Sequence, residues 1–268
     1  MAVTIYYLSA TGNSLHMAKK IAEVMRRQEE VQLISITEAL VTEDFSPEGS
    51  VGFVMPLHFF ALPLLAEEFL KKVDLKKATY VFGIVTAGFH YIGDACREFK
   101  ELVEAAGGQM QAFFYVDMVS VYLPLGDLPS PKKTKKKLAA ADHKAPVIAQ
   151  KILRREQASA LEVFSFPSKV MHQMVQKQQE KLDQDFYARD NCVHCGLCAQ
   201  ICPKKNIALE AGKPCWQHDC TQCLACLHIC PQQCIELGSH TKGRQRYHHP
   251  DIAVSELFPP WSTRKKTI

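Results

Sequence analysis

The chain has 268 residues, of which 47% are hydrophobic and 22% are charged, and its net charge is +4. This composition excludes a disordered or fibrous protein, and the net charge is too small to indicate nucleic-acid binding without a concentrated basic patch. Of the 11 cysteines, only Cys96 lies in the first 190 residues, and the others fall between Cys192 and Cys234. The chain therefore consists of two unlike parts.

The first part alternates short apolar runs with segments of helical periodicity. We expect strands at 3–8, 31–36, 51–55, 80–86 and 111–121. We expect helices at 14–27, 64–73 and 93–106, the last of them closed by Gly107 and Gly108. Strands and helices that alternate in this way form a doubly wound parallel sheet, here of five strands in an α/β fold.

The loop after the first strand has the composition of a phosphate site. It reads Ser9-Ala10-Thr11-Gly12-Asn13-Ser14, and a helix follows it directly. A helix N-terminus offers backbone N–H groups and a partial positive charge, and small hydroxyl side chains add donors. The loop lacks both the lysine of G-x4-G-K-[ST] and the glycines of G-x-G-x-x-G, which disfavours a nucleoside triphosphate and a dinucleotide. The candidate residues are Ser9, Thr11, Gly12, Asn13 and Ser14.

Two further loops leave the carboxyl ends of strands, where doubly wound sheets bind ligands. The loop after the third strand contains Pro56, Leu57, His58, Phe59 and Phe60. The loop after the fourth strand contains Thr86, Ala87, Gly88, Phe89, His90 and Tyr91. Both loops carry aromatic rings that can flank a flat ring system. Together with a phosphate loop, they suit a mononucleotide with a large planar head.

A basic segment, 132–155, follows the sheet region. Residues 131–156 carry nine positive charges against two negative ones. The simplest interpretation is a solvated helix or loop, and the sharper one is a docking surface for an acidic partner protein. No aromatic residues interleave with the lysines, so we do not expect nucleic-acid binding. A polar helix is expected at 169–181, leading into the cysteine-rich part.

The apolar stretches and the cysteines indicate the cellular compartment in which the protein is expected. The longest uncharged apolar stretch, 51–66, has 16 residues and contains two prolines. Roughly 20 apolar residues are needed to span a bilayer, so we expect no membrane insertion. The first residues, MAVTIYYLSATGNS, lack the pattern of a signal peptide. We therefore expect a cytoplasmic protein whose thiols are reduced or metal-bound rather than paired as disulfides.

The second part contains a duplicated cysteine motif. Its first copy, followed by Pro203, consists of Cys192, Cys195, Cys198 and Cys202. Its second copy, followed by Pro231, consists of Cys220, Cys223, Cys226 and Cys230. Each copy is C-x2-C-x2-C-x3-C-P, the bacterial ferredoxin run that binds a [4Fe–4S] cluster. Zinc is the alternative, but zinc ribbons pair two C-x2-C knuckles across a long gap.

The fourth cysteine of each motif serves the other cluster in two-cluster ferredoxins. We therefore assign one cluster to Cys192, Cys195, Cys198 and Cys230. We assign the other cluster to Cys202, Cys220, Cys223 and Cys226. The duplication does not require Cys215 or Cys234 as ligands, so we interpret both, together with Cys96, as packing thiols.

The motifs resemble known families. S-A-T-G-N-S resembles the flavodoxin phosphate loop [ST]-x-T-G-x-[ST], P-L-H-F-F-A-L-P its second flavin loop, and T-A-G-F-H-Y-I-G its third. The whole chain, including G-R-Q-R-Y-H-H-P at 243–250, is similar to the bacterial flavodoxin–ferredoxin fusion family. This resemblance implies a flavodoxin-like FMN-binding domain at 1–165, a linker at 166–184, a ferredoxin-like domain with two [4Fe–4S] clusters at 185–240 and a tail at 241–268.

Two redox modules in one chain indicate electron transfer. The leading hypothesis is a carrier that moves single electrons between FMN, two [4Fe–4S] clusters and a redox partner protein, which docks at segment 132–155. One alternative is a flavin-dependent reductase of a small molecule fed by its own clusters. Another is a redox-sensing regulatory protein. The sequence shows no catalytic triad and no paired carboxylates, so we assign no catalytic residues.

Overall fold

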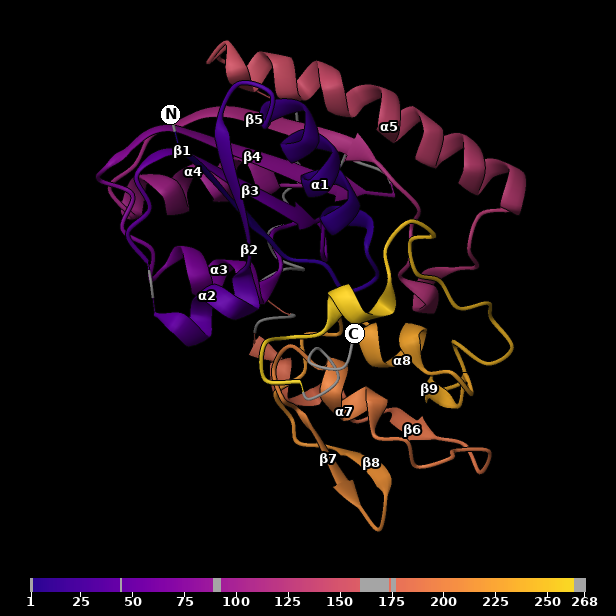
Figure 1. The fold of residues 1–268 in the computed structure, drawn as a ribbon. Coiled ribbons are helices and arrows are strands. Elements are labelled where there is room, and N and C mark those ends of the chain that lie inside the picture. Colours follow the sequence, from indigo (N-terminus) through magenta and orange to yellow (C-terminus); the bar gives the residue numbers. More distant parts are fainter. Residues whose placement is uncertain (1, 44, 89–92, 160–173, 175–176, 263–268) are drawn as a thin grey trace. The chain divides into compact units, whose positions relative to one another are not determined.

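The computed structural model describes residues 2–43, 45–88, 93–159, 174 and 177–262 (Figure 1). Its contacts divide the chain into two compact units. The first unit comprises Met1–Ser9, Asn13–Val119 and Ser130–Gln173. The second comprises Ala10–Gly12, Ser120–Pro129 and Met174–Ile268. The domain boundary expected at residue 165 lies outside the described residues.

A five-stranded parallel sheet forms the centre of the first unit. Its strands are β1 (Ala2–Tyr7), β2 (Glu30–Ser35), β3 (Gly49–Pro56), β4 (Ala78–Ala87) and β5 (Met110–Asp117). They lie in the order β2-β1-β3-β4-β5, and every neighbouring pair is parallel. This is the flavodoxin-like order of a doubly wound sheet. The α/β fold expected from the alternating sequence pattern is therefore confirmed.

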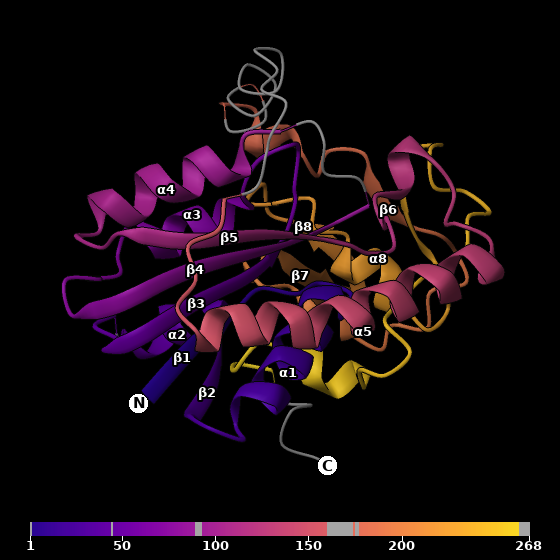
Figure 2. The same cartoon turned by 90° about the horizontal axis from the view of Figure 1, so that it is seen from above.

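Helices cover both faces of this sheet (Figure 2). One face packs against α1 (Asn13–Met25) and α5 (Pro131–Leu153), and the other against α2 (Ile36–Thr42), α3 (Leu64–Leu70) and α4 (Ala95–Ala105). Side chains alternate along the strands, so that Phe82 and Ile84 face the first layer while Val81 and Val85 face the second. Burial on both faces explains why the central strands are apolar throughout. Among the described residues, no helix combines the length and the apolar character needed to cross a bilayer.

Three details differ from the sequence expectations or go beyond them. Helix α2 was not expected, because its seven residues are too few to show a helical period. Strand β5 ends at Asp117 rather than at residue 121. The basic segment, which was expected to be either a helix or a loop, forms helix α5. Its buried stripe packs in the same core as α1 and consists of Ala141, Ala145, Ile148, Ala149 and Ile152.

The second unit repeats one small motif twice, with equivalent residues 28 positions apart. Helices α7 (Leu197–Ile201) and α8 (Ala225–Ile229) are equivalent, as are strands β7 (Ile207–Glu210) and β9 (Ile235–Leu237). Strand β6 (Phe186–Ala188) of the first half pairs with β9 of the second, and β8 (Lys213–Trp216) of the second half pairs with β7 of the first. Each half therefore completes the sheet of the other. This arrangement agrees with the small ferredoxin-like α+β domain expected from the cysteine motifs.

Short helical turns and a long tail complete the second unit. The 3₁₀ turns are η1 (Leu123–Leu125), η2 (Gln179–Lys181) and η3 (Val254–Leu257). Leu123 is 1% exposed and lies in the core of this unit with Leu227 and Ile235. Most of the polar helix expected at 169–181 lies outside the described residues, and η2 is its described end.

Candidate functional site

The eight cysteines of the two motifs line two pockets of the second unit. The first pocket is lined by Cys192, Cys195, Cys198 and Cys230. The second is lined by Cys202, Cys220, Cys223 and Cys226. Each pocket brings together the first three cysteines of one motif and the fourth of the other. The two linings are equivalent, as expected from a duplication.

The backbone around the cysteines adopts the same unusual conformation in both halves. Left-handed φ angles occur at three equivalent pairs of positions, namely His194 and Gln222, Gly196 and Leu224, and Lys205 and Gln233. A left-handed conformation costs a non-glycine residue roughly 1–2 kcal/mol. Strain repeated at equivalent positions is typical of a ligand site.

These turns direct backbone N–H groups toward sulfur. The N–H of Gln222 donates to Cys220 Sγ at 3.2 Å, and the N–H of Asn206 donates to Cys202 Sγ at 3.3 Å. Successive N–H groups in such a turn form a concave site for negative charge. A hydrogen bond from an N–H group stabilises the thiolate form of cysteine. The backbone of the second pocket is therefore arranged for anionic sulfur.

Burial has the opposite effect on the thiols themselves. It raises the pKa of Cys198 and the pKa of Cys202 to about 11, with neighbouring cysteines and acidic groups contributing. It also raises the pKa values of Cys220, Cys223 and Cys226. These thiols are protonated at neutral pH unless a cation binds them, and metal binding releases their protons. Thiols that are buried together and supplied with N–H donors suit a metal centre.

Trp216 provides a second test of what the second pocket can hold. Its ring stacks on Phe186, with centroids 5.3 Å apart, and both residues line the pocket. Its indole Nε1 is buried and has no hydrogen-bond partner among the described residues. A buried donor without an acceptor costs about 1–3 kcal/mol. The sulfur atoms of a cluster are acceptors that such a donor can use, so the lining is compatible with an iron–sulfur group.

The first pocket contains a thiol that the motif does not account for. Cys234 is 2% exposed, lines this pocket, and places its Sγ 3.4 Å from Cys230 Sγ. Its position outside both motifs indicates only a packing thiol, and the contact with Cys230 is visible only in the structure. Cys215 lies in β8 without lining either pocket, and Cys96 is buried in the α4 core.

In the first unit, the loops at the carboxyl edge of the sheet are joined by side-chain hydrogen bonds. The hydroxyl groups of Ser14 and Thr86 are 2.9 Å apart, and Asn13 Nδ2 donates to the carbonyl of Val119 at 3.1 Å. Helix α1 thus begins at the carboxyl end of β1, where the strand order reverses between β2 and β3. This is the switch point at which doubly wound sheets bind ligands.

The loop after β3 contains a strained aromatic turn. His58 and Ala61 exchange two backbone hydrogen bonds of 3.0 Å, and between them Phe59 and Phe60 have φ angles of +47° and +64°. Turns of this shape favour Asn-Gly, because bulky residues are disfavoured at positive φ. Both rings are partly exposed. The sequence identified these residues as ring-bearing but contained no sign of the turn.

The remaining candidates lie along the same strand ends. Pro56 ends β3, Thr86 and Ala87 end β4, and the N–H of Leu57 donates to the carbonyl of Thr86 at 2.8 Å. The carbonyl of Gly88 accepts a hydrogen bond from Lys137 Nζ at 2.9 Å. Ser9 follows β1 and is partly buried. Phe89, His90 and Tyr91 lie outside the described residues.

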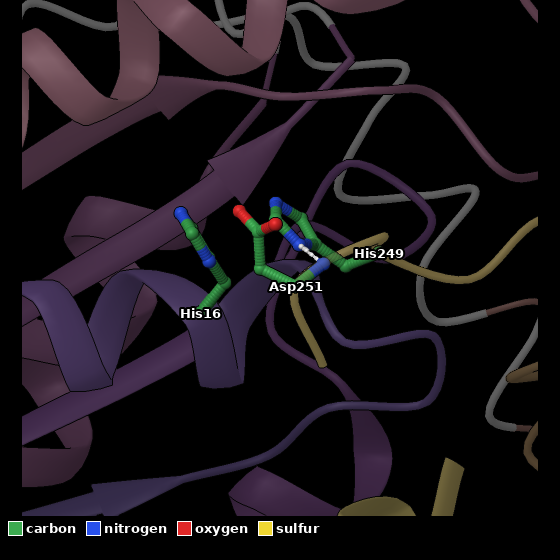
Figure 3. Close-up of side chains that lie close together, drawn as sticks. All are labelled: His16, His249 and Asp251. Carbon is green, nitrogen blue, oxygen red and sulfur yellow. Dashed lines mark hydrogen bonds between the residues drawn. The ribbon is translucent and has the colours of Figure 1, made fainter. Parts of the chain in front are cut away.

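The middle of the expected phosphate loop is held by the C-terminal tail within the second unit. The N–H of His249 donates to the carbonyl of Thr11 at 2.7 Å. A Cβ atom at Gly12, where φ is +97°, would lie 2.9 Å from His249 Cβ, so this position requires glycine. The N–H of Asp251 donates to His249 Nδ1 at 3.2 Å (Figure 3). The tail motif is therefore part of this loop's environment, which its sequence did not indicate.

The fold and these sites define an α/β protein with a flavodoxin-like sheet and a second unit built around two crossed cysteine quartets. No family model and no curated protein matches the chain. Among solved structures, the flavodoxin of Megasphaera elsdenii is 19% identical, with 53% of this chain and 98% of that chain covered and a TM-score of 0.36. A flavodoxin from the domain Archaea is 19% identical, with coverage of 57% and 99% and a TM-score of 0.35. An azoreductase from Bacillus anthracis is 10% identical, with coverage of 56% and 99% and a TM-score of 0.37. The fold class rests on the strand order, because these TM-scores are below 0.5.

Proposed function

We propose that the chain is an electron-transfer protein. It binds FMN at the carboxyl edge of the first unit's sheet and two [4Fe–4S] clusters in the second unit, and it moves single electrons between these groups and a redox partner protein. The observation that carries the proposal is the pair of pockets, each lined by three cysteines of one motif and one of the other.

The proposed cluster ligands fall into two sets. The first set is Cys192, Cys195, Cys198 and Cys230, and the second is Cys202, Cys220, Cys223 and Cys226. [4Fe–4S] clusters supply one-electron chemistry at potentials that depend on hydrogen bonds to sulfur and on solvent exposure. The backbone of Gln222 and Asn206 donates to sulfur, and apolar side chains such as Leu227 and Ile235 exclude water.

The proposed flavin site uses the three loops at the sheet edge. The phosphate would lie at the start of α1, at Ser9, Thr11, Gly12, Asn13 and Ser14. The ring would lie against the loops that contain Pro56, Leu57, His58, Phe59, Phe60, Thr86, Ala87, Gly88, Phe89, His90 and Tyr91. Uncharged groups at a helix N-terminus bind phosphate through hydrogen bonds and the helix dipole. The strained turn at Phe59 and Phe60 supports a ligand site, because strain of this kind persists where function requires it.

A continuous chain segment connects the two cofactor regions. Two residues separate the end of β5 from segment 120–129. This segment packs within the second unit. There the hydroxyl of Tyr122 donates to Gln222 Oε1 at 2.6 Å, and the N–H of Gln222 donates to Cys220 Sγ at 3.2 Å. Within the second unit, this segment therefore contacts the residue whose backbone donates to a cysteine sulfur.

The proposed docking surface for the partner protein lies at the start of α5. Its members are the exposed lysines Lys132, Lys133, Lys135 and Lys136. Lys137 is different, because its Nζ donates to the carbonyls of Gly88 and Met118. Exposed charges of one sign accelerate association with an acidic protein, and added salt screens the effect. The transfer rate to an acidic redox protein should therefore fall steeply with salt, and it should lose this dependence when the four lysines are replaced by glutamine.

Cofactor analysis after anaerobic reconstitution tests the proposal. We expect about eight iron atoms and eight acid-labile sulfides per chain, together with about one FMN. Zinc without sulfide, or no metal, would contradict the cluster assignment. Two kinetic assays separate the alternatives. Sustained turnover of a quinone or nitro compound would indicate a small-molecule reductase, and partner binding that depends on oxidation without electron flux would indicate a regulator.

A further inference from the structure

The thiol of Cys234 gives the two cluster sites different properties. We propose that Cys234 is a reserve ligand of the first cluster site, able to bind the iron that Cys230 otherwise holds. This inference rests on the proposed function, since it requires that the first pocket binds a cluster. It concerns a cysteine outside both motifs.

The position of Cys234 supports this role. Its Sγ lies 3.4 Å from Cys230 Sγ, and it lines the same pocket as Cys192, Cys195 and Cys198. Because the two sulfur atoms are this close, a small movement brings Cys234 Sγ to the position of Cys230 Sγ. The side chain is 2% exposed, so its sulfur faces the protein interior rather than solvent.

The backbone of Cys234 is fixed beside the first motif. The N–H of Arg189 donates to the carbonyl of Cys234 at 2.9 Å, and the Arg189 guanidinium donates to the carbonyl of Gln233 at 2.7 Å. Asn191 Nδ2 donates to the carbonyl of Gln232 at 3.1 Å. These three bonds come from the residues just before Cys192. They hold the segment in place when Cys230 itself is replaced.

The second site has no equivalent reserve. The residue 28 positions before Cys234 is Asn206, whose N–H donates to Cys202 Sγ. Its side chain donates to Asp183 Oδ2 at 2.8 Å and accepts from the N–H of Asp219 at 2.6 Å. The amide is therefore engaged in a buried polar network. The repeat thus places a thiol beside one fourth cysteine and an amide beside the other.

The exchange of ligands is chemically balanced. In a chain that lacks the Cys230 thiol, the S–H bond of Cys234 breaks, an Fe–S bond forms, and the proton goes to solvent. The iron keeps one thiolate in this position, so the charge of the site is unchanged. No oxidant or reductant is required.

Matched cysteine variants test the inference. Iron and acid-labile sulfide are measured per chain in the wild type, Cys230→Ala, Cys234→Ala, Cys202→Ala and the double variant Cys230→Ala/Cys234→Ala, each after anaerobic reconstitution. We expect Cys230→Ala to keep both clusters, whereas Cys202→Ala and the double variant each lose about half of the iron and sulfide. Low-temperature EPR should show that the retained first cluster has altered g values in Cys230→Ala, because its ligand has changed.

Two outcomes would overturn the inference. One is a loss in Cys230→Ala as large as that in the double variant, a comparison that does not depend on how well Cys202→Ala folds. The other is a loss of half the iron in Cys234→Ala alone, which would make Cys234 the native ligand. A wild-type chain that binds no cluster would instead refute the proposed function, and the inference with it.

Discussion

The side chains of Glu236 and Arg246 form a buried ion pair in the second unit, with Arg246 Nη2 donating to Glu236 Oε2 at 2.9 Å. Both side chains are at most 5% exposed. Glu236 also accepts from the hydroxyl of Thr241 at 2.6 Å, and Arg246 donates to the carbonyls of Ile235 and Thr241. This network joins strand β9 to the arginine-containing tail motif. The tail is therefore an integral part of the unit that contains the cysteine pockets.

Removal of one partner should destabilise this unit strongly. Arg246→Ala removes the buried partner of the Glu236 carboxylate and leaves it only the half-exposed Arg189 guanidinium, whose Nε lies 3.4 Å from Glu236 Oε1. We therefore expect a loss of about 3 kcal/mol, at the lower end for a broken buried ion pair. The change in the free energy of unfolding is measured by urea denaturation, monitored by a spectroscopic signal that reports on the second unit. Lys242→Ala is the matched control, because Lys242 is exposed in the same tail and only approaches the Tyr187 ring at 5.9 Å. The control should lose no more than about 1 kcal/mol. Equal losses in both variants would contradict this account of the tail.

The Trp216 indole should affect one cluster and not the other. Trp216→Phe keeps an aromatic ring against Phe186 and removes the Nε1–H donor that has no acceptor among the described residues. A lost hydrogen bond to sulfur destabilises the reduced cluster. We expect the potential of the second cluster to fall by about 60 mV, which is ~1.4 kcal/mol for a one-electron couple. An EPR-monitored titration measures both clusters, and the first serves as internal control. An unchanged second potential would show that the indole N–H does not donate to the cluster.

The strained turn offers a way to separate ring stacking from loop shape. Asparagine and glycine favour the left-handed conformation, so the double variant Phe59→Asn/Phe60→Gly should keep the turn between His58 and Ala61. Aromatic contacts contribute about 0.5–1.5 kcal/mol each. We therefore expect FMN to bind about tenfold more weakly, as measured by fluorescence titration, without a fall in the thermal midpoint. An unchanged affinity for FMN would show that these two rings do not contact the flavin.

Tyr80 should make the stability of the first unit sensitive to alkaline pH. Burial raises the pKa of Tyr80 to about 12, and its hydroxyl donates to the carbonyl of Glu156 at 2.7 Å. The folded state favours the neutral phenol, so its contribution is complete below the unfolded pKa of about 10 and is lost as the pH rises from about 10 to 12. Tyr80→Phe should be less stable by about 1 kcal/mol at pH 8.

The stability difference between the two proteins should therefore shrink above about pH 10 and reverse its sign by pH 12. Ionisation of the unfolded wild type removes up to ~2–3 kcal/mol of its stability by pH 12, and Tyr80→Phe has no such loss at this position. Denaturant unfolding between pH 8 and 12 measures the difference. A difference that stays constant over this range would show that the phenol is not held in its neutral form.

Much of the fold could be predicted because its strongest signals are local. The apolar runs at β3 and β4 are long and bounded by loops, and the cysteine spacing specifies its own geometry. Gly107, at φ +82°, ends α4 as its sequence context indicates. Helix α2 was missed because it begins directly after β2 and is only seven residues long. The end of β5 was placed too late, because Val121 is apolar but its carbonyl accepts a hydrogen bond from His228 Nε2 at 2.8 Å instead of a strand neighbour.

The site could be predicted only in part, because some of its features depend on residues far apart in the sequence. The orphaned Trp216 donor lies on β8, which pairs with β7 across the two halves. The contact of Cys234 with Cys230 spans only four residues, but it depends on the left-handed turn at Gln233, which the spacing of the cysteines does not indicate. The turn at Phe59 and Phe60 contradicts local preference, so no sequence rule indicates it. The hydrogen bond between His249 and Thr11 joins positions 238 residues apart, and neither position carries a signal for the other.

An anaerobic redox titration of the reconstituted chain, followed by optical absorbance and EPR, tests the central claim most directly. Two separate one-electron iron–sulfur signals and a flavin absorbance change, all in one chain, are the predicted result. A protein that is EPR-silent after full reduction, or that shows a single cluster or no flavin transition, would contradict the account.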